Sequence, residues 1–282
     1  MSQGLGAVWL DLLSGGGIEI VCLAPDVTRM KDLDYTVPAD AEAQIKELAL
    51  RYAKASRGGI ELIAALGGRA ETWLSRLPGP VRGGLDTATQ AALGKALQAA
   101  QASRHAVPDQ KPWVNSVLGA AMGAAGGFGG AATALAELPI TTTLLMRVIQ
   151  GVAAEHGFDP SDQNVQFDCL TVFASAGPLA SDDGADSGFL AARVALNGAA
   201  LQRILQTVAP RLAAALGQKL AAQAVPVLGA AAGAAINYSY TTYYREIAHV
   251  HFALRRLAIE ADVPERVLIA CLQREMAVLG KG

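Results

Sequence analysis

The segment GAAINYSYTTYYREIAHVHFALRRL, residues 233–257, carries the most regular pattern in the chain. Its large apolar side chains recur at spacings of four and three residues, which is the spacing of one face of an α-helix. They are Ile236, Tyr240, Tyr243, Ile247, Val250, Leu254 and Leu257. This apolar seam predicts a long helix whose seam side is buried against other helices.

The composition agrees with a helical protein. The chain has 282 residues, of which 52% are hydrophobic, 17% are charged and only 5% are aromatic. The hydrophobic excess therefore comes from alanine, glycine and leucine, and small side chains let helices approach closely. Apart from residues 1–38, where IEIVCLAP (18–25) is compatible with a short strand, no segment alternates as strands do. We predict an all-α fold: a single compact multi-helix domain with a short N-terminal arm that contains at most a small β element.

Charge and cysteine content exclude some classes of partner and location. The formal net charge is −2 and no basic run is present, which argues against nucleic acid as a partner. Cys22, Cys169 and Cys271 are scattered, with no disulfide framework and no CxxC pair. The N-terminal MSQGLGAVWLDLLSGGG lacks the basic region of a secretory signal, so a cytoplasmic location is expected.

Two glycine- and alanine-rich segments are the expected central helices. SVLGAAMGAA (116–125) and PVLGAAAGAA (226–235) match at eight of ten positions, and each has glycines four residues apart. Such glycines (Gly119, Gly123 and Gly127; Gly229 and Gly233) share one helix face and permit close helix packing. The uncharged run 114–136 is long enough to span a bilayer, but its alanines and glycines contribute little insertion energy. A packed soluble core is favoured, with a membrane-dipping pair as the alternative.

Further helices are expected on both sides of the first glycine-rich segment. One begins at Pro38 and Asp40 with Ile45, Leu48 and Tyr52 on one stripe, the segment 59–77 follows, and another helix spans about 85–103. Later, a helix is expected from about 189 to 208. The chain is thus divided into an arm at 1–38, a helical domain at 39–260 and a C-terminal helix at 261–282.

Pro139 is expected to begin a new helix that ends at Gly157, because proline is tolerated in the first turn of a helix. The three threonines that follow it either cap this first turn, which is the preferred interpretation, or line a small polar site. In the next segment Asp159 or Ser161 is the expected cap. Its predicted inner stripe consists of Val165, Cys169 and Val172.

No motif for catalysis, metal binding or cofactor binding is present. The histidines (His105, His156, His249 and His251) form no HExxH pattern, and His249 and His251, two residues apart, point to nearly opposite sides of a helix. His251 is expected to be a half-buried structural residue. There is no GxSxG and no phosphate-binding loop. The aspartates at 182, 183 and 186 lack the spacing of a calcium loop, so we expect a solvated loop and no metal or cofactor.

The best candidate site is a distributed set of polar residues after the two glycine-rich segments. Thr143 and Arg147 share a helix face, as do Asn237, Thr241 and Tyr244. If the glycine-rich helices pair, the two sets come within reach of each other. The full set is Glu137, Thr141, Thr142, Thr143, Arg147, Asn237, Thr241 and Tyr244. The alternative, which we favour, is a buried hydrogen-bond network that fixes helix packing.

Three segments together resemble the EcsC protein family: ELPITTTLLMR (137–147), DSGFLAARVAL (186–196) and the segment 233–257. The family combines an acid-Leu-Pro-x-Thr-Thr-Thr step, a Ser-Gly-aromatic stretch and a Gly-Ala-x-x-Asn-Tyr segment, all present here in order over roughly 39–260. The resemblance implies a bacterial, intracellular protein linked to membrane processes, since the family is named from a gene beside those of an ABC transporter. It supplies no catalytic residues.

Three functions follow as hypotheses. The first, which we choose, is a non-enzymatic accessory protein that acts through a membrane surface or a membrane-protein partner, with peripheral attachment to the inner face of the membrane. The second is a carrier that holds a lipid or another apolar ligand between helices. The third is an enzyme without a recognisable motif. Exposed apolar stripes favour the first, an apolar pocket the second, and a water-accessible cleft with perturbed titratable groups the third.

Overall fold

The described part of the chain is all-helical, as predicted. This computed structural model describes residues 37–65, 92–93, 95–103, 121, 130–173 and 229–279, which are helical apart from short connections. The labelled helices are α1 (Ala39–Ala65), α5 (Gly130–Glu155), α6 (Gln163–Phe173), α9 (Gly229–Glu260) and α10 (Glu265–Leu279). All of these residues belong to one compact unit, Tyr35–Gly282.

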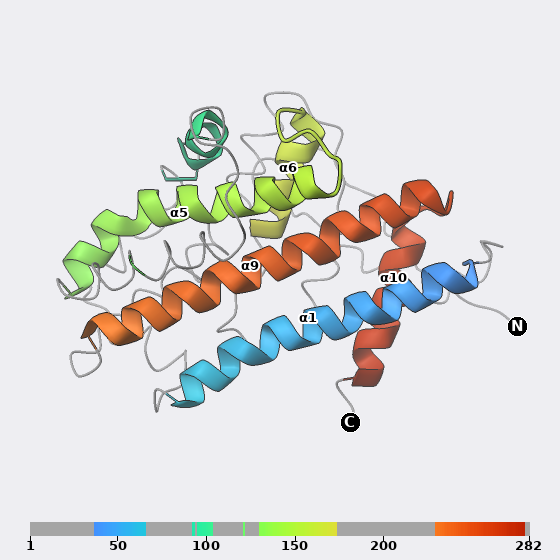
Figure 1. Ribbon diagram of the computed structural model, residues 1–282, viewed down its shortest axis with the longest axis horizontal. Coiled ribbons are helices and arrows are strands. Elements are labelled where there is room, and N and C mark those ends of the chain that lie inside the picture. The colour runs from blue at the N-terminus through green and yellow to red at the C-terminus, as the bar shows by residue number, and fades with distance from the viewer. Residues whose placement is uncertain are drawn as a thin grey trace, which may run out of the picture. The chain divides into compact units, whose positions relative to one another are not determined.

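Helix α9 occupies the central position among these helices (Figure 1). It packs against α1 on one side and α5 on the other, while α6 contacts α5 and α9, and α10 contacts α1 and α9. The chain direction of α5 is the same as that of α9, whereas α1 runs the opposite way (Figure 1). Each of the other four labelled helices therefore contacts α9 directly.

The seam of α9 is confirmed as the centre of the core. All seven predicted seam residues are buried, from Ile236 at 0% exposure to Leu257 at 4%. On α1 the predicted stripe of Ile45, Leu48 and Tyr52 is also buried. The Pro38 carbonyl accepts the Glu42 N–H at 3.0 Å, and acidic residues in the first turn complement the positive end of the helix dipole. Helix α1 then continues past Gly58 as far as Ala65, so the first two predicted segments join there.

The prediction that Pro139 begins a helix is wrong. Pro139 lies inside α5, which starts nine residues earlier at Gly130. A proline inside a helix loses one hydrogen bond and bends the axis, and α5 does bend in its N-terminal part (Figure 1). The threonines consequently cannot be an N-terminal cap. Instead Thr143 Oγ1 donates to the Pro139 carbonyl at 2.8 Å, one turn back within the helix.

The C-terminal ends of α5 and α9 both pass through a residue in the left-handed conformation. After α5, Gly157 adopts φ 80°, its N–H bonds the Ala154 carbonyl, and the Phe158 N–H bonds the Ala153 carbonyl. This double hydrogen bond is a Schellman motif, which ends a helix with a residue in the left-handed conformation. After α9, Asp262 takes that conformation at φ 52°. Because the turn at Gly157 is fixed, His156 is held at the end of α5.

The predicted cap of α6 is also corrected. The helix begins at Gln163, and Asp162 caps it by accepting the Asn164 N–H at 2.8 Å. Asp159 instead accepts the Ser161 N–H, which stabilises the preceding turn. The predicted inner stripe of α6 is confirmed, because its residues are buried: Val165, Cys169 and Val172.

An ion pair attaches α6 to α9. The Arg255 guanidinium donates to the Asp168 carboxylate, and His251 Nε2 lies 3.5 Å from its other oxygen. Asp168 and His251 are each only 3% exposed, so His251 is fully buried and not half-buried as predicted. Arg255 also lies 4.5 Å above the Phe158 ring. Removing one partner of such a buried ion pair lowers the stability of the fold by more than the intact pair contributes. The reason is that the remaining charge is buried without an opposite charge beside it.

Several predictions fall on residues outside the described part. These are the arm and its β element in residues 1–36, most of the uncharged run 114–136, the aspartate loop, the helix at 189–208, and the contacts of all five glycines in the two glycine-rich segments. Among the helices that the structure describes, none is both long and apolar enough to cross a membrane.

The central position of α9 predicts a large difference between two identical substitutions on that helix. Ile247 is 0% exposed, whereas Ile259 is 65% exposed. Ile247→Ala should lower the free energy of unfolding by about 2–5 kcal/mol, because it removes buried methyl groups and leaves a cavity. Ile259→Ala should change it by less than about 0.5 kcal/mol. Urea denaturation followed by circular dichroism measures both, and similar losses would contradict the described core.

Candidate functional site

A groove runs between α1 and α9. Its volume is about 710 Å³, and the described residues that line it belong to these two helices. From α1 it is lined by Arg51, Lys54, Ala55 and Gly58, and from α9 by Ala234, Ala235, Tyr238, Ser239, Thr242, Tyr243 and Glu246. The volume lies within the range of small-molecule sites in proteins.

Small residues account for the space between the helices. A Cβ atom added at Gly58 would meet nothing within 4 Å, and the alanines at 55, 234 and 235 project only one carbon. The two aromatic walls differ in exposure, because Tyr243 is buried while Tyr238 is 52% exposed. An apolar ligand in this groove would therefore meet alanine side chains and tyrosine rings.

The groove has a polar end and an apolar end. Because α1 and α9 are antiparallel, Arg51 on α1 meets Glu246 on α9, and Arg51 Nε donates to Glu246 Oε2 at 2.5 Å. The opposite end is lined by Gly58, Ala234 and Ala235. The lining residues of α9 span Ala234–Glu246, which corresponds to about 18 Å of helix at 1.5 Å per residue.

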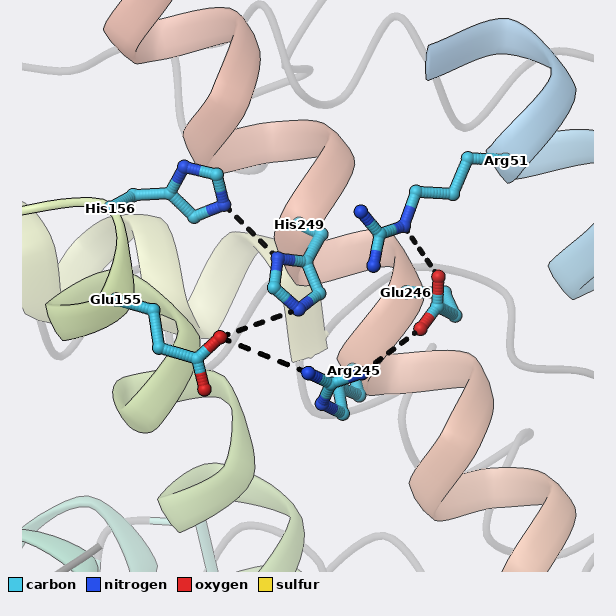
Figure 2. Close-up of polar contacts among 6 residues, drawn as sticks. All are labelled: Arg51, Glu155, His156, Arg245, Glu246 and His249. Carbon is cyan, nitrogen blue, oxygen red and sulfur yellow. Dashed lines mark hydrogen bonds and ion pairs between the residues drawn. The ribbon is translucent and has the colours of Figure 1, made fainter. Parts of the chain in front are cut away.

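Behind the polar end, a chain of contacts reaches the end of α5 (Figure 2). Arg245 Nη1 lies 3.3 Å from the other oxygen of Glu246, and Arg245 Nη2 lies 3.8 Å from Glu155 Oε2. The same Glu155 oxygen is 3.6 Å from His249 Nε2. Three helices, α1, α9 and α5, thus share one network in which two arginines face two glutamates.

Two histidines complete the network. His156 Nε2 and His249 Nδ1 are 3.1 Å apart, and their rings meet edge to face with centroids 5.3 Å apart. Since His249 Nε2 faces the Glu155 carboxylate, we assign its proton to Nε2, so that Nδ1 accepts from His156. Both imidazoles are neutral in this assignment.

The surroundings of both rings favour the neutral form. Burial, followed by the charges of Arg51 and Arg245 and by His156, lowers the pKa of His249 to about 3. Burial, followed by Arg51 and Arg256, also lowers the pKa of His156. The network therefore holds two neutral histidines beside two balanced ion pairs at neutral pH. Within the part of the chain that the structure describes, no group of His, Cys, Asp or Glu side chains is placed to hold a metal ion.

The described polar residues singled out from the sequence lie elsewhere on α5 and α9, and none of them lines the groove. Asn237, Thr241 and Tyr244 are buried, and Thr241 Oγ1 donates to the Asn237 carbonyl at 2.8 Å. The Tyr244 ring packs against Phe173 of α6 with centroids 5.1 Å apart. These contacts support the interpretation as a structural network.

The set on α5 is similarly enclosed. Thr141 and Thr142 are buried, while the side chain of Glu137 lies outside the described part. Arg147 is half-buried, and its Nη1 donates to Ser103 Oγ at 2.7 Å, on the helical segment 95–103. Because α5 and α9 run in the same direction, with Glu155 beside Arg245 and His249, Arg147 lies level with Asn237 and Thr241 along α9. The two predicted sets are thus on neighbouring helices at the same height.

Two spacing signals could have revealed the groove. Tyr238, Thr242 and Glu246 recur every four residues beside the apolar seam, and so form a second stripe on α9. On α1, Arg51, Ala55 and Gly58 recur at spacings of four and three residues beside the buried stripe. The histidine pair carried no such signal, because His156 and His249 come from different helices that meet only in the fold.

A comparison with models of known protein families shows which family this chain belongs to. The family model described as "EcsC protein family" matches residues 104–257, more than half of the chain. The chain belongs to the EcsC family. The matched range is shorter than the 39–260 inferred from the motifs. It includes the groove-lining part of α9 and does not include α1. Neither a curated protein nor a solved structure matches the chain.

The lowered pKa values of the two histidines predict a loss of stability in mild acid. Below pH 6.5 the unfolded chain binds protons at these histidines, whereas folded His249 stays neutral down to about pH 3. The free energy of unfolding must therefore fall as the pH is lowered from 7 to 5.5. The slope is at most about 1.4 kcal/mol per pH unit for each histidine, and solvent screening of this partly open network reduces it.

Denaturant titrations of the wild type and His249→Gln at pH 7, 6.5, 6 and 5.5 measure this slope. Glutamine keeps a neutral polar side chain but does not titrate, so the variant should lose less stability over this range than the wild type. Equal slopes for both proteins would contradict the assignment of a neutral, buried His249.

Proposed function

We propose that this chain is a ligand-binding protein that performs no covalent chemistry, and that the apolar part of its ligand lies in the groove between α1 and α9. The observation that carries this proposal is the groove itself: about 710 Å³ of space, in which alanine, glycine and tyrosine account for more than half of the described lining residues. Pockets of this size and lining are typical of small-molecule sites. Among the three hypotheses from the sequence, the geometry supports the carrier best.

The polar groups of the groove are better suited to binding than to catalysis. A nucleophilic hydroxyl needs a general base within hydrogen-bond reach. Ser239 and Thr242 line the groove, but His156 and His249 are not among its lining residues. Those histidines hydrogen-bond to each other behind the polar end of the groove. This arrangement supports a non-enzymatic role.

The exposed apolar side chains favour a ligand over a broad apolar contact with a membrane. The large ones among the described residues, Leu50, Ile140, Tyr238, Ile259 and Val278, are distributed over four helices. Single exposed apolar residues are normal on a protein surface and mark no interface. Membership of the EcsC family supports a further part of the proposal. We propose that the chain is a bacterial protein that delivers or senses its ligand as an accessory to membrane proteins such as ABC transporters.

Filling the groove should abolish binding without harming the fold. In Gly58→Leu the new side chain enters the groove, and the added Cβ has no atom within 4 Å. Replacing a helical glycine also raises the stability of the helix by roughly 0.5–1 kcal/mol. The variant should therefore have an equal or higher melting temperature, and should lose most of its binding of Nile red, a neutral apolar dye, measured by fluorescence.

Gly151→Leu is the matched control. Gly151 also lies inside a helix, α5, with nothing within 4 Å of an added Cβ, but it does not line the groove. It should gain similar stability and keep the binding of Nile red. Unchanged dye binding in Gly58→Leu, or equal loss in both variants, would contradict the groove as the ligand site.

A further inference from the structure

The charged side chains among the described lining residues lie at one end of the groove and are mainly positive. Arg51 and Lys54 extend from α1, and Glu246 faces them from α9. Among the lining residues that the structure describes, two cations and one anion leave an excess positive charge beside mainly apolar walls. A ligand that complements this surface has an apolar body and an anionic end.

Arg51 already binds a carboxylate, and that carboxylate can be exchanged. Its Nε donates to Glu246 Oε2 at 2.5 Å, yet the two side chains are 36% and 22% exposed. A pair that solvent can reach contributes little to stability, so its replacement by another carboxylate costs little. Moreover, Glu246 keeps a second cationic partner, because Arg245 Nη1 lies 3.3 Å from its other oxygen. Neither Glu246 nor Arg51 would be left as an unpaired charge.

We propose that the groove binds a long-chain carboxylate, a fatty acid anion, whose carboxylate replaces Glu246 on Arg51. The chain then extends along Ala55 and Gly58 toward Ala234 and Ala235 at the apolar end, and Lys54 adds positive charge near the head group. A carboxylate is preferred over a phosphate because the resident partner of Arg51 is itself a carboxylate of the same planar shape. This inference rests on the proposed function, since it names the ligand of the same groove.

Displacement of Nile red by two ligands of equal chain length tests the proposal. Palmitate carries the anionic head, and hexadecanol is its neutral counterpart, both used below the concentration at which they aggregate. Palmitate should bind the wild type about tenfold more tightly than hexadecanol does. This is the gain in affinity that one hydrogen bond to a charged group provides. Arg51→Gln should lose this preference and leave the affinity for hexadecanol unchanged.

Two further variants separate the head-group contact from general effects of charge. Arg57→Gln removes a cation from the same helix at an exposed position that does not line the groove, and should change neither affinity. Glu246→Gln removes the competing carboxylate and should tighten palmitate binding severalfold without affecting hexadecanol. If Arg51→Gln is poorly folded by circular dichroism, Arg51→Lys replaces it. Lysine keeps the charge but lacks the planar fork, so it should weaken palmitate binding partially.

The possible outcomes distinguish the two levels of the proposal. If both ligands displace the dye equally in the wild type and in Arg51→Gln, the carboxylate inference is wrong while the apolar groove site stands. If neither ligand displaces the dye, or the dye does not bind, the proposed function itself is wrong. Weaker palmitate binding by Glu246→Gln would overturn the exchange on Arg51. Tighter binding of hexadecyl phosphate than of palmitate would overturn the choice of a carboxylate.

Discussion

The rest of the structure depends on the burial of α9. Its aromatic and aliphatic side chains occupy so much of the helix surface between Ile236 and Leu257 that α1, α5, α6 and α10 must all pack against it. A narrow stripe from Tyr238 through Thr242 to Glu246 is less deeply buried than the seam. Ala55 and Gly58 of α1 leave space beside this stripe, and Arg51 and Lys54 line the polar end of the resulting groove.

Electrostatics connects the groove to the rest of the fold. Glu246 lines the groove and at the same time contacts Arg245, which reaches Glu155 at the end of α5 (Figure 2). A ligand that takes Arg51 away from Glu246 therefore alters the charge balance around Arg245. Since burial and nearby arginines already disfavour protonation of His249, that side chain should respond to the same change. On the proposed function, a ligand in the groove would thus change the electrostatics of the contact between α5 and α9.

Predictions from the sequence were correct for those features of the fold that one local physical effect determines. The helical period of large apolar residues identified the buried faces of α1, α6 and α9, because burial of such residues outweighs any other preference along a helix. It failed at Pro139, where the packing of α5 overrides the tendency of proline to stand at a helix start. Similarly, the cap of α6 shifted to Asp162, because three neighbouring polar residues could each have capped it and only the turn geometry chooses.

The candidate site was harder to predict because it is defined by the meeting of distant segments. Arg51 and Glu246 are 195 positions apart, and His156 and His249 are 93 apart, so neither pair leaves a local pattern. The polar residues that the sequence did suggest, such as Asn237 and Tyr244, proved to be buried ones, since polarity within a regular helix does not tell which side faces a cavity. A groove forms where side chains are too small to fill the space between two helices. Alanine and glycine in a helix are equally compatible with tight packing, so their presence in the sequence does not predict a groove.

The central claim is that the space between α1 and α9 is a binding site, and photo-crosslinking tests it most directly. A palmitate analogue with a diazirine at the end of its chain is bound to the protein, irradiated, and located by mass spectrometry of the digested protein. We expect the label in peptides that contain Gly58 of α1 or Ala234–Tyr238 of α9, with excess palmitate suppressing it. Labelling that excess palmitate suppresses, but that falls only outside these two segments, would contradict the account.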